Sequence, residues 1–362
     1  MPPKNRHAEH EPKIAKTLLH DLFHTDFRDA LHKDFQDLKE FMLSEERRAR
    51  LKRMGRIRRG LMMAWLLFKA LILKLTPTRR ILLVIGGILI LQHDTNSEDQ
   101  NLHILGALML LFVLMLELKD KLLAHEELEA GHAVQKALMP ERSPAVPGWD
   151  LWLFTRSANE VGGDLIDFIR LENKRFGIAL GDVAGKGLHA ALLTAKLQAT
   201  LEAIVHDFTS LGRMGEKLNH IFYRNRLPNI FASLVYLEIR PGSGSVQVLN
   251  AGHYEPVLLK GTKAVKMDKG GPALGIVPKT PFTEQKVRLR KGDLLLVYSD
   301  GLTEARNEQG VFFGEPRLSD RLQENAGLSA SQMGEKLVGA VDRFLGKARA
   351  SDDLSIVIIK KV

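Results

Sequence analysis

Five aspartates in the sequence lie beside short apolar runs or glycines, and carboxylates in this pattern suit a site for divalent cations. They are Asp164, Asp182, Asp300 and the adjacent pair Asp352 and Asp353. Four of them adjoin apolar runs, which are Phe176–Leu180, Leu294–Tyr298 and Leu354–Ile359. Such runs indicate buried strands, so the carboxylates are expected at strand ends. Because Mg²⁺ and Mn²⁺ prefer oxygen ligands, the pattern predicts a site for one of these cations. Any one of these aspartates taken alone would more often be a turn residue or a helix cap.

The glycine-rich segment 185–190 suggests two phosphate-binding loops, and both are rejected. A Walker loop needs Ser or Thr after Gly-Lys, whereas Gly187 follows Lys186. A dinucleotide-binding turn needs a second strand that ends in an acid about 20 residues further on. The residues that follow, to about Arg224, have the periodicity of helices instead.

Five motifs follow one another along the second half of the chain. They are Glu-Val-Gly-Gly-Asp ending at Asp164, Gly-Asp-Val-Ala-Gly-Lys-Gly ending at Gly187, Asn-Ala-Gly-His ending at His253, Tyr-Ser-Asp-Gly-Leu-Thr-Glu-Ala ending at Ala305, and Asp-Asp-Leu-Ser ending at Ser355. In this order they resemble the metal-dependent type 2C (PPM) Ser/Thr protein phosphatases, in particular the bacterial SpoIIE-like branch of stress-response regulators. The resemblance covers about Glu126–Val362. It implies an α-β-β-α sandwich with a two-metal cleft at one end.

The resemblance also implies roles for individual residues. Asp182 would bridge two divalent cations, Mn²⁺ or Mg²⁺, and the carbonyl of Val183 would add a ligand. Asp300 and Asp352 would bind one cation directly, and Asp164 would act mainly through ordered water. Asp182 and Asp300 are the residues expected to matter most for catalysis, because a pair of cations about 3.5–4 Å apart can activate a water and neutralise phosphoryl charge.

Other polar residues near these motifs have less definite roles. Asp353 occupies a position where the family tolerates Asn, so it is expected outside the direct metal ligands. Glu160 and Asp167 are candidates for the same outer position, with a solvated strand carboxylate or a helix cap as an equal alternative. An arginine that binds substrate phosphate cannot be assigned, and Arg156 and Lys186 are candidates only. The Asn-Ala-Gly-His motif is interpreted as a turn between strands.

Composition limits the classes of function. The 362-residue chain has no cysteine, which excludes disulfides and thiol nucleophiles. Its net charge of +9 first suggests a nucleic-acid-binding protein, but Arg47–Arg59 alone contains eight Lys or Arg and no acid. The remainder is nearly neutral, so we expect no nucleic-acid partner.

The N-terminal part is predicted to be helical and associated with a membrane. Residues 1–60 contain an amphipathic helix, Ile14–Met42, and the basic run. Residues 61–118 contain hydrophobic helices, with a transmembrane hairpin at about 79–118 whose connecting loop is acidic. Basic flanks outside an acidic loop predict that both ends are cytoplasmic, which places the protein in the inner membrane with its catalytic domain in the cytoplasm. The two apolar runs are short for a bilayer, so a soluble helical bundle remains the alternative.

The segment 119–147 is predicted to be a regulatory helix, Lys119–Leu138, followed by a Pro-rich boundary. By resemblance, such a helix carries regulatory input and pairs with its copy in a homodimer. The phosphatase domain would then span 148–362.

The domain at 148–362 is predicted to belong to the α+β class, because strands and helices come in runs. The predicted strands are Trp149–Arg156, Leu165–Leu171, Arg175–Asp182, Ile230–Ile239, Ser245–Leu249, Pro256–Leu259, Gln285–Leu289, Asp293–Tyr298 and Leu354–Ile359. The predicted helices are Ala190–His206, Leu211–Arg224, Leu318–Glu324 and Ser331–Leu345.

The resemblance implies hydrolysis of phosphoserine or phosphothreonine, on a STAS-type protein that antagonises an anti-sigma factor. Two other classes stay open. One is a catalytically weak or dead domain that binds a partner, and the other is a membrane-bound metal or nucleotide sensor without turnover.

Overall fold

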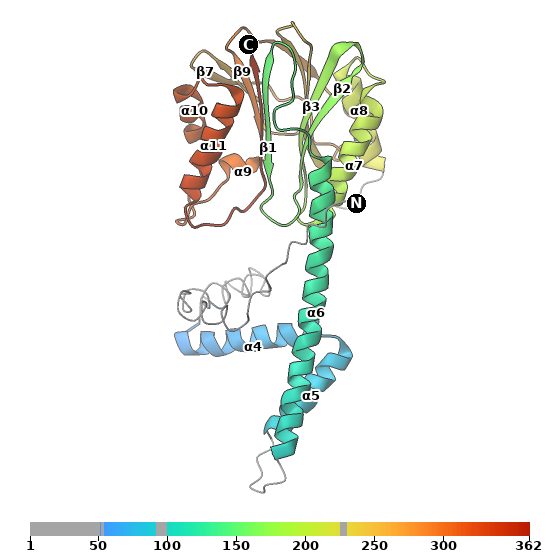
Figure 1. Ribbon diagram of the computed structural model, residues 1–362, viewed down its shortest axis with the longest axis vertical. Coiled ribbons are helices and arrows are strands. Elements are labelled where there is room, and N and C mark those ends of the chain that lie inside the picture. Colours follow the sequence, from blue (N-terminus) through green and yellow to red (C-terminus); the bar gives the residue numbers. More distant parts are fainter. Residues whose placement is uncertain (1–50, 52–53, 92–99, 225–229) are drawn as a thin grey trace, which may run out of the picture. The chain divides into compact units, whose positions relative to one another are not determined.

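The computed structural model describes residues 51, 54–91, 100–224 and 230–362, and the chain divides into two compact units at Lys121/Leu122 (Figure 1). The predicted helix Ile14–Met42 and nearly all of the acidic loop lie outside the described residues, as does part of the basic run.

The second unit, Leu122–Val362, is built around two five-stranded sheets, which we call sheet A and sheet B. Sheet A has the order β1-β10-β9-β6-β7 and sheet B the order β2-β3-β4-β5-β8, and neighbouring strands are antiparallel throughout. Sheet A comprises β1 Trp149–Arg156, β6 Val257–Lys260, β7 Lys263–Lys266, β9 Leu294–Tyr298 and β10 Leu354–Lys361. Sheet B comprises β2 Asp164–Leu171, β3 Arg175–Val183, β4 Ala232–Ile239, β5 Ser245–Ala251 and β8 Glu284–Arg288.

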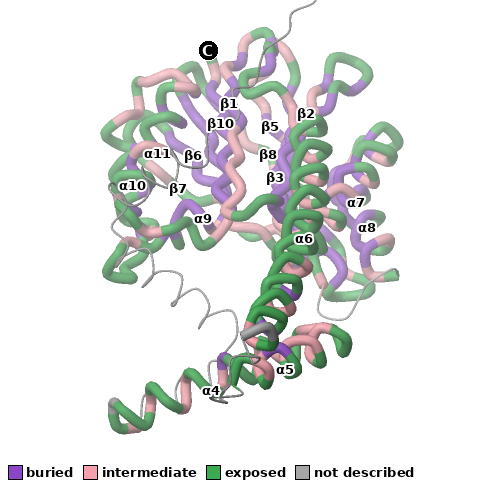
Figure 2. The backbone as a smooth tube through the Cα atoms, turned by 60° about the horizontal axis from the view of Figure 1, so that its bottom comes forward, coloured by how far each residue is buried: buried purple, intermediate pink, exposed green. Residues whose placement is uncertain are grey.

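Helices cover the outer face of each sheet (Figure 1). Helices α7 Leu188–Val205 and α8 Leu211–Arg224 pack on sheet B, and α10 Gly314–Glu324 and α11 Ala330–Leu345 pack on sheet A next to the short helix α9 Asp300–Thr303. Apolar side chains form three layers, one between the sheets and one under each pair of helices. Figure 2 shows that buried residues gather along the strands and the packed helices of this unit. The predicted α-β-β-α sandwich is therefore confirmed.

Glycine permits the closest approach between α11 and sheet A. A Cβ atom at Gly334 would collide with the ring of Trp152, which is itself buried. The helix can thus lie directly on the indole, whose large apolar area stabilises this layer.

The last part of helix α6 also belongs to the second unit. Helix α6 runs without a break from Gln100 to Leu138, so the predicted hydrophobic span and the predicted regulatory helix are parts of one helix. Within Leu122–Leu138, the side-chain amide of Gln135 donates to the carbonyl of Gly162 (2.9 Å) and accepts from its N–H (3.1 Å). This pair of hydrogen bonds fixes the helix to the loop that precedes β2.

In the first unit, helix α5 Pro77–Leu91 packs against the N-terminal part of α6. A Cβ at Gly86 or Gly106 would lie 3.1 or 2.8 Å from the other glycine's carbonyl oxygen, so the two backbones are in close contact. Arg79 forms ion pairs with Glu117 and Asp120, both at 2.7 Å. By length and composition, one helix among the described residues, Leu102–Leu138, could cross a membrane.

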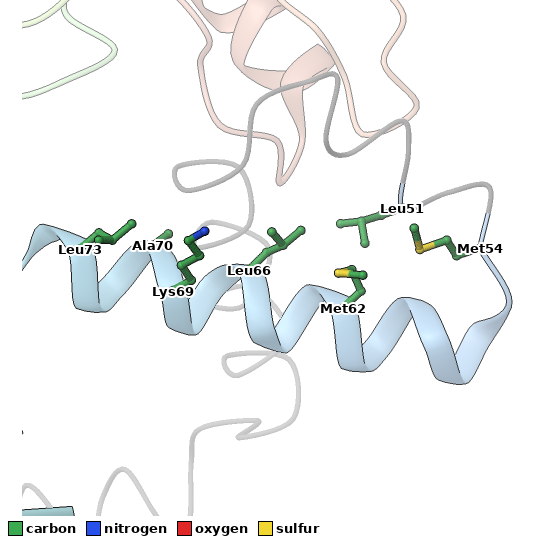
Figure 3. Close-up of a pocket in the computed structure, with 7 residues that line it drawn as sticks. All are labelled: Leu51, Met54, Met62, Leu66, Lys69, Ala70 and Leu73. Carbon is green, nitrogen blue, oxygen red and sulfur yellow. The ribbon is translucent and has the colours of Figure 1, made fainter. Parts of the chain in front are cut away.

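Helix α4 Arg56–Lys74 carries an apolar groove along one side (Figure 3). The groove is lined by Leu51, Met54, Met62, Leu66, Lys69, Ala70 and Leu73. Its lining contains no acid or hydroxyl that could do chemistry, so it is not a candidate catalytic site. On the same helix Ile57, Leu61 and Trp65 remain exposed.

Candidate active site

Sheet B supplies two of the predicted carboxylates. Asp164 at the start of β2 is paired directly with Asp182 near the end of β3, and Asp182 is paired in turn with Ser233 of β4. Side chains alternate between the two faces of a strand. Because Ile166 and Leu180 belong to the layer between the sheets, Asp164 and Asp182 face the same space at its end.

Sheet A supplies the other carboxylates. Strand β9 ends at Tyr298, Asp300 begins helix α9, and β10 starts directly after Asp353. Strands β9 and β10 are antiparallel neighbours, so these residues meet at one edge of the sheet. The hydroxyl of Ser299 donates to the carbonyl of Asp353 (2.9 Å) and accepts from the N–H of Ser355 (2.9 Å). These bonds fix the start of α9 beside Asp352 and Asp353.

The electrostatics show that carboxylates from the two sheets converge. Burial raises the pKa of Asp182 to about 6, with further contributions from Asp352 and Asp353 of sheet A. Burial likewise raises the pKa of Asp300 to about 6, with contributions from Asp352 and Asp182. Burial, with Asp182 and Asp353 nearby, raises the pKa of Asp164 well above its usual range. The five carboxylates of this cluster repel one another, and a cation would relieve that repulsion.

The donor set fits a divalent cation, but the carboxylates are spread more widely than one ion requires. All the groups are oxygen donors, and the Oδ2 atom of Asp164 is buried without a hydrogen-bond partner. In the part of the chain that the structure describes, however, no three acidic or His side chains are close enough to bind one ion together. The ammonium of Lys186 lies 3.2 Å from Asp352 Oδ2. Binding a cation would therefore require the carboxylates to move closer and Lys186 to leave Asp352.

The raised pKa values predict an unusual pH dependence of stability in the absence of metal. A carboxyl group with a higher pKa in the folded than in the unfolded state binds more protons when folded, so lowering the pH stabilises the fold. For Asp182 and Asp300 this gain develops as the pH falls through about 6 and is complete below their unfolded value, 3.8. We expect the unfolding temperature in EDTA to rise between pH 7.5 and 5, and Mn²⁺ to reverse the trend. A steady fall in EDTA that the Asp182→Asn/Asp300→Asn double variant leaves unchanged would contradict this prediction.

Asp353 binds the backbone of the loop before β2. Its Oδ1 atom accepts from Ala158 N (2.8 Å), and its Oδ2 atom accepts from Gly163 N (2.6 Å) and more weakly from Asp164 N (3.4 Å). The carboxylate is buried, and its oxygens are occupied by these N–H groups. Asp353 thus positions Asp164 through the backbone.

The structure places the other candidates differently. Asp167 lies on the opposite face of β2 from Asp164, towards α7, where Gln198 and Glu202 are its neighbours. The Oε1 atom of Glu160 lies 2.8 Å from the Nδ1 atom of His125 in α6, within hydrogen-bonding distance. Neither residue joins the converging carboxylates.

The two candidate phosphate-binding residues also differ. Arg156 is engaged by both carboxylate oxygens of Asp342 in α11, at 3.2 and 2.6 Å. Lys186 contacts Asp352 and donates to the carbonyl of Ser351 (2.8 Å), so it lies at the site itself. Of the two, only Lys186 is in a position to reach a phosphate bound there.

Sequence reasoning missed the polar residues behind the carboxylates. Ser233, Ser299 and Ser355 form hydrogen bonds around them, and the ring of His253 contacts Ser233. The predicted turn at Asn250–His253 is observed, since Asn250 Oδ1 accepts from His253 N (2.9 Å). The polar residues within the strand-end motifs could have indicated these hydrogen bonds. Their partners could not be identified, because they come from distant segments of the chain.

Comparisons with known proteins agree with these observations. The family described as Stage II sporulation protein E matches residues 172–362, which include Asp182, Asp300 and Asp352 but not Asp164. Protein IcfG of Synechocystis sp. is 26% identical over 265 residues, 64% of this chain and 41% of IcfG. Phosphoserine phosphatase RsbU of Bacillus subtilis is 24% identical over 238 residues, 65% of this chain and 70% of RsbU. This chain thus spans less than half the length of IcfG.

The fold also matches a solved phosphatase-type domain. The SiaA-PP2C domain of Pseudomonas aeruginosa superimposes with a TM-score of 0.57 at 17% identity, over 67% of this chain and 98% of that domain. At this identity the match shows the fold.

Proposed function

The chain belongs to the Stage II sporulation protein E (SpoIIE) family, and from this premise we propose that it is a metal-dependent protein phosphatase acting on phosphoserine or phosphothreonine. The observation that carries the proposal is the convergence of Asp182, Asp300 and Asp352 from the two sheets, where the charge of Asp352 helps to raise the pKa of both Asp182 and Asp300. Structural ion pairs would have partnered these acids with basic residues, whereas here only Asp352 has a cationic partner among the described ion pairs.

Two divalent cations, when bound, would supply a nucleophilic water at neutral pH and neutralise charge on the phosphoryl oxygens. Asp182, the Val183 carbonyl, Asp300 and Asp352 would bind them. Asp164 would accept a hydrogen bond from a water through its buried Oδ2. Lys186, once displaced from Asp352, would bind the substrate phosphate.

The direct test is hydrolysis of para-nitrophenyl phosphate by the full-length protein in detergent, with Mn²⁺ and with EDTA. We expect turnover that requires the metal. Binding of Mn²⁺ without any hydrolysis would instead support the non-catalytic alternatives, and no binding at all would refute the cation site.

We propose that the substrate is a phosphorylated STAS-type antagonist of an anti-sigma factor. Two observations support this substrate class. The relative RsbU is named a phosphoserine phosphatase, and the sequence motifs of this chain resemble those of the SpoIIE-like branch. The test compares hydrolysis rates for a phosphorylated STAS domain and for an unstructured phosphoserine peptide. Equal rates for the two would contradict this substrate class.

We also propose that α5 and the N-terminal part of α6 form a hairpin in the inner membrane, with the catalytic domain in the cytoplasm. Most of the large apolar side chains of both helices are exposed, including Ile81, Ile88, Leu108 and Leu114. The close contact at Gly86 and Gly106 is typical of helix pairs in membranes. Helix α5 has 15 residues, and at the helical rise it spans roughly 22 Å of a hydrocarbon core about 30 Å thick.

This proposal predicts how the protein fractionates. The full-length protein should stay in the membrane fraction at high salt and leave it only in detergent, because apolar contacts with lipid do not weaken with ionic strength. A tag inserted between Thr95 and Asn101 should be accessible only from the far side of the membrane. Complete release by salt would favour a soluble or peripherally bound bundle.

We propose further that the C-terminal part of α6 pairs with its copy in a homodimer. Gln135 binds the catalytic domain, while Val134 and Leu138 on the same helix expose 62% and 48% of their surface. A second copy would cover this apolar side without disturbing the bonds to Gly162.

Charged substitutions at Val134 and Leu138 should therefore weaken self-association at least about tenfold and change phosphatase turnover, because burying an unpaired charge is costly. Sedimentation of the detergent-solubilised protein measures the first effect and para-nitrophenyl phosphate hydrolysis the second. A Lys136→Glu variant, with its exposed charge, is the matched control. Wild-type association and turnover in the Val134 and Leu138 variants would make this segment a plain linker.

A further inference from the structure

His253 follows β5 of sheet B and is half-buried, and both nitrogens of its imidazole have partners. The Nδ1 atom lies 2.7 Å from the hydroxyl of Ser233, and the Nε2 atom lies 3.2 Å from the carbonyl oxygen of Tyr298. A ring whose two nitrogens both have partners has a fixed orientation.

These partners determine the tautomer. A carbonyl oxygen can only accept, so Nε2 carries the proton and donates to Tyr298. Nδ1 then accepts from the hydroxyl of Ser233. Burial lowers the pKa of His253 to about 4, so the ring is neutral at pH 7 and has one proton to donate.

Each partner adjoins a proposed metal ligand, and the two belong to different sheets. Ser233 of β4 is paired directly with Asp182 of β3 in sheet B. Tyr298 ends β9 in sheet A, and only Ser299 separates it from Asp300. The imidazole therefore connects the backbone beside Asp182 to the backbone beside Asp300.

The backbone of His253 is positioned independently of its ring. Asn250 accepts from His253 N and donates to the carbonyls of His253 (3.2 Å) and Tyr254 (3.4 Å). Gly252 has a φ of +72°, and any side chain there would collide with the backbone of Ala273. The turn is thus determined by Asn250 and Gly252, so replacing the ring of His253 should leave it intact.

We propose that His253 is a positioning residue that sets the separation of Asp182 and Asp300 and thereby the affinity of the site for divalent cations. This inference rests on the proposed function, since it concerns the same cation site. Polar groups that orient metal ligands from behind typically contribute about 10–100-fold in metal affinity or activity. The two hydrogen bonds of the His253 ring go to Ser233 and Tyr298 rather than to a carboxylate, so His253 acts through the two strands that carry the ligands.

Three variants separate the two arms of this connection. Ser233→Ala removes the contact on the side of Asp182. His253→Gln keeps an N–H group that can reach Tyr298 but loses the Ser233 contact. His253→Leu is of similar volume and loses both. The exposed His220 of α8 provides the control, His220→Gln.

The experiment titrates Mn²⁺ into the full-length protein in detergent and measures free Mn²⁺ by electron paramagnetic resonance. Unfolding temperature in EDTA and hydrolysis of para-nitrophenyl phosphate are followed in parallel. We expect Mn²⁺ affinity to fall about tenfold in Ser233→Ala and His253→Gln and about 100-fold in His253→Leu. At saturating Mn²⁺ the turnover of each variant should be much closer to the wild-type value than its Mn²⁺ affinity is. The unfolding temperature in EDTA should change little in Ser233→Ala and His253→Gln.

The outcomes are distinguishable. If the wild type binds Mn²⁺ and hydrolyses substrate but Ser233→Ala and His253→Gln bind Mn²⁺ equally well, this inference is wrong and the proposed function stands. If those variants lose stability in EDTA in proportion to their loss of affinity, His253 serves packing alone and the inference is again wrong. A wild type that binds no Mn²⁺ refutes the proposed function itself.

Discussion

Replacing Asp182 with Asn is expected to reduce phosphatase turnover more than about 100-fold. Removing a residue that only orients the metal ligands already lowers metal affinity or activity about 10–100-fold, and Asp182 is itself a proposed ligand. Asn retains the shape of the side chain but has one neutral oxygen donor in place of two charged ones. The same change removes a carboxylate that is desolvated and lies near Asp352 and Asp353. The metal-free protein should consequently be as stable as the wild type or more stable at pH 7.5.

Measurement of turnover and Mn²⁺ affinity in the same preparation tests this prediction. The exposed Asp320 of α10 gives the matched control, Asp320→Asn, which should behave as wild type. Asp300→Asn and Asp352→Asn should lose activity to a similar degree. An Asp182→Asn protein that turns over at a large fraction of the wild-type rate would disprove the proposed arrangement of ligands.

Replacing Asp353 with Ala should cost both stability and activity. It leaves the N–H groups of Ala158 and Gly163 without their charged acceptor, and bonds of this kind contribute about 1.5–3 kcal/mol each. Relief of repulsion with Asp164 and Asp182 offsets part of that loss, so we expect a net destabilisation of about 2–4 kcal/mol. Activity should fall too, since the released loop carries Asp164.

Asp353→Asn should be much milder, because the amide oxygen can still accept from Gly163. Chemical denaturation in EDTA measures the stability of both variants, and hydrolysis with saturating Mn²⁺ measures activity. If Asp353→Ala kept wild-type stability, the hydrogen bonds to the loop would contribute nothing. If Asp353→Asn were more damaging to turnover than Asp352→Asn, Asp353 would be the direct ligand instead.

The sandwich was predictable because its central strands are strongly patterned. Strand β9 is a continuous apolar run and β10 is apolar from Ile356 to Ile359, as burial on both faces requires, and both were predicted to within two residues. Strand β7 was missed because Lys263–Lys266 is a short edge strand with a lysine at each end. Helix α9 was missed because four residues show no helical period.

The candidate site was predictable in its acids and less so in their surroundings. Alternation along β2 would have separated Asp167 from Asp164, since an odd spacing on a strand puts two side chains on opposite faces. The pairing of Arg156 with Asp342 could not be read from the sequence, because it depends on how α11 lies on sheet A. Helix α6 crosses the change from apolar to charged residues near Glu117 unbroken, since backbone hydrogen bonds do not depend on that polarity.

The position of β10 has a consequence for synthesis on the ribosome. It pairs along its whole length with β1, and Trp149 meets Lys361, yet it also separates β1 from β9 in sheet A. Until Leu354–Lys361 has been translated, β1 and β9 have no partner on their facing edges, and their apolar side chains remain accessible to chaperones or to other nascent chains. Pairings so distant in sequence also form slowly. Translation that stops before this strand would therefore yield an aggregation-prone product with unpaired strands rather than a smaller phosphatase.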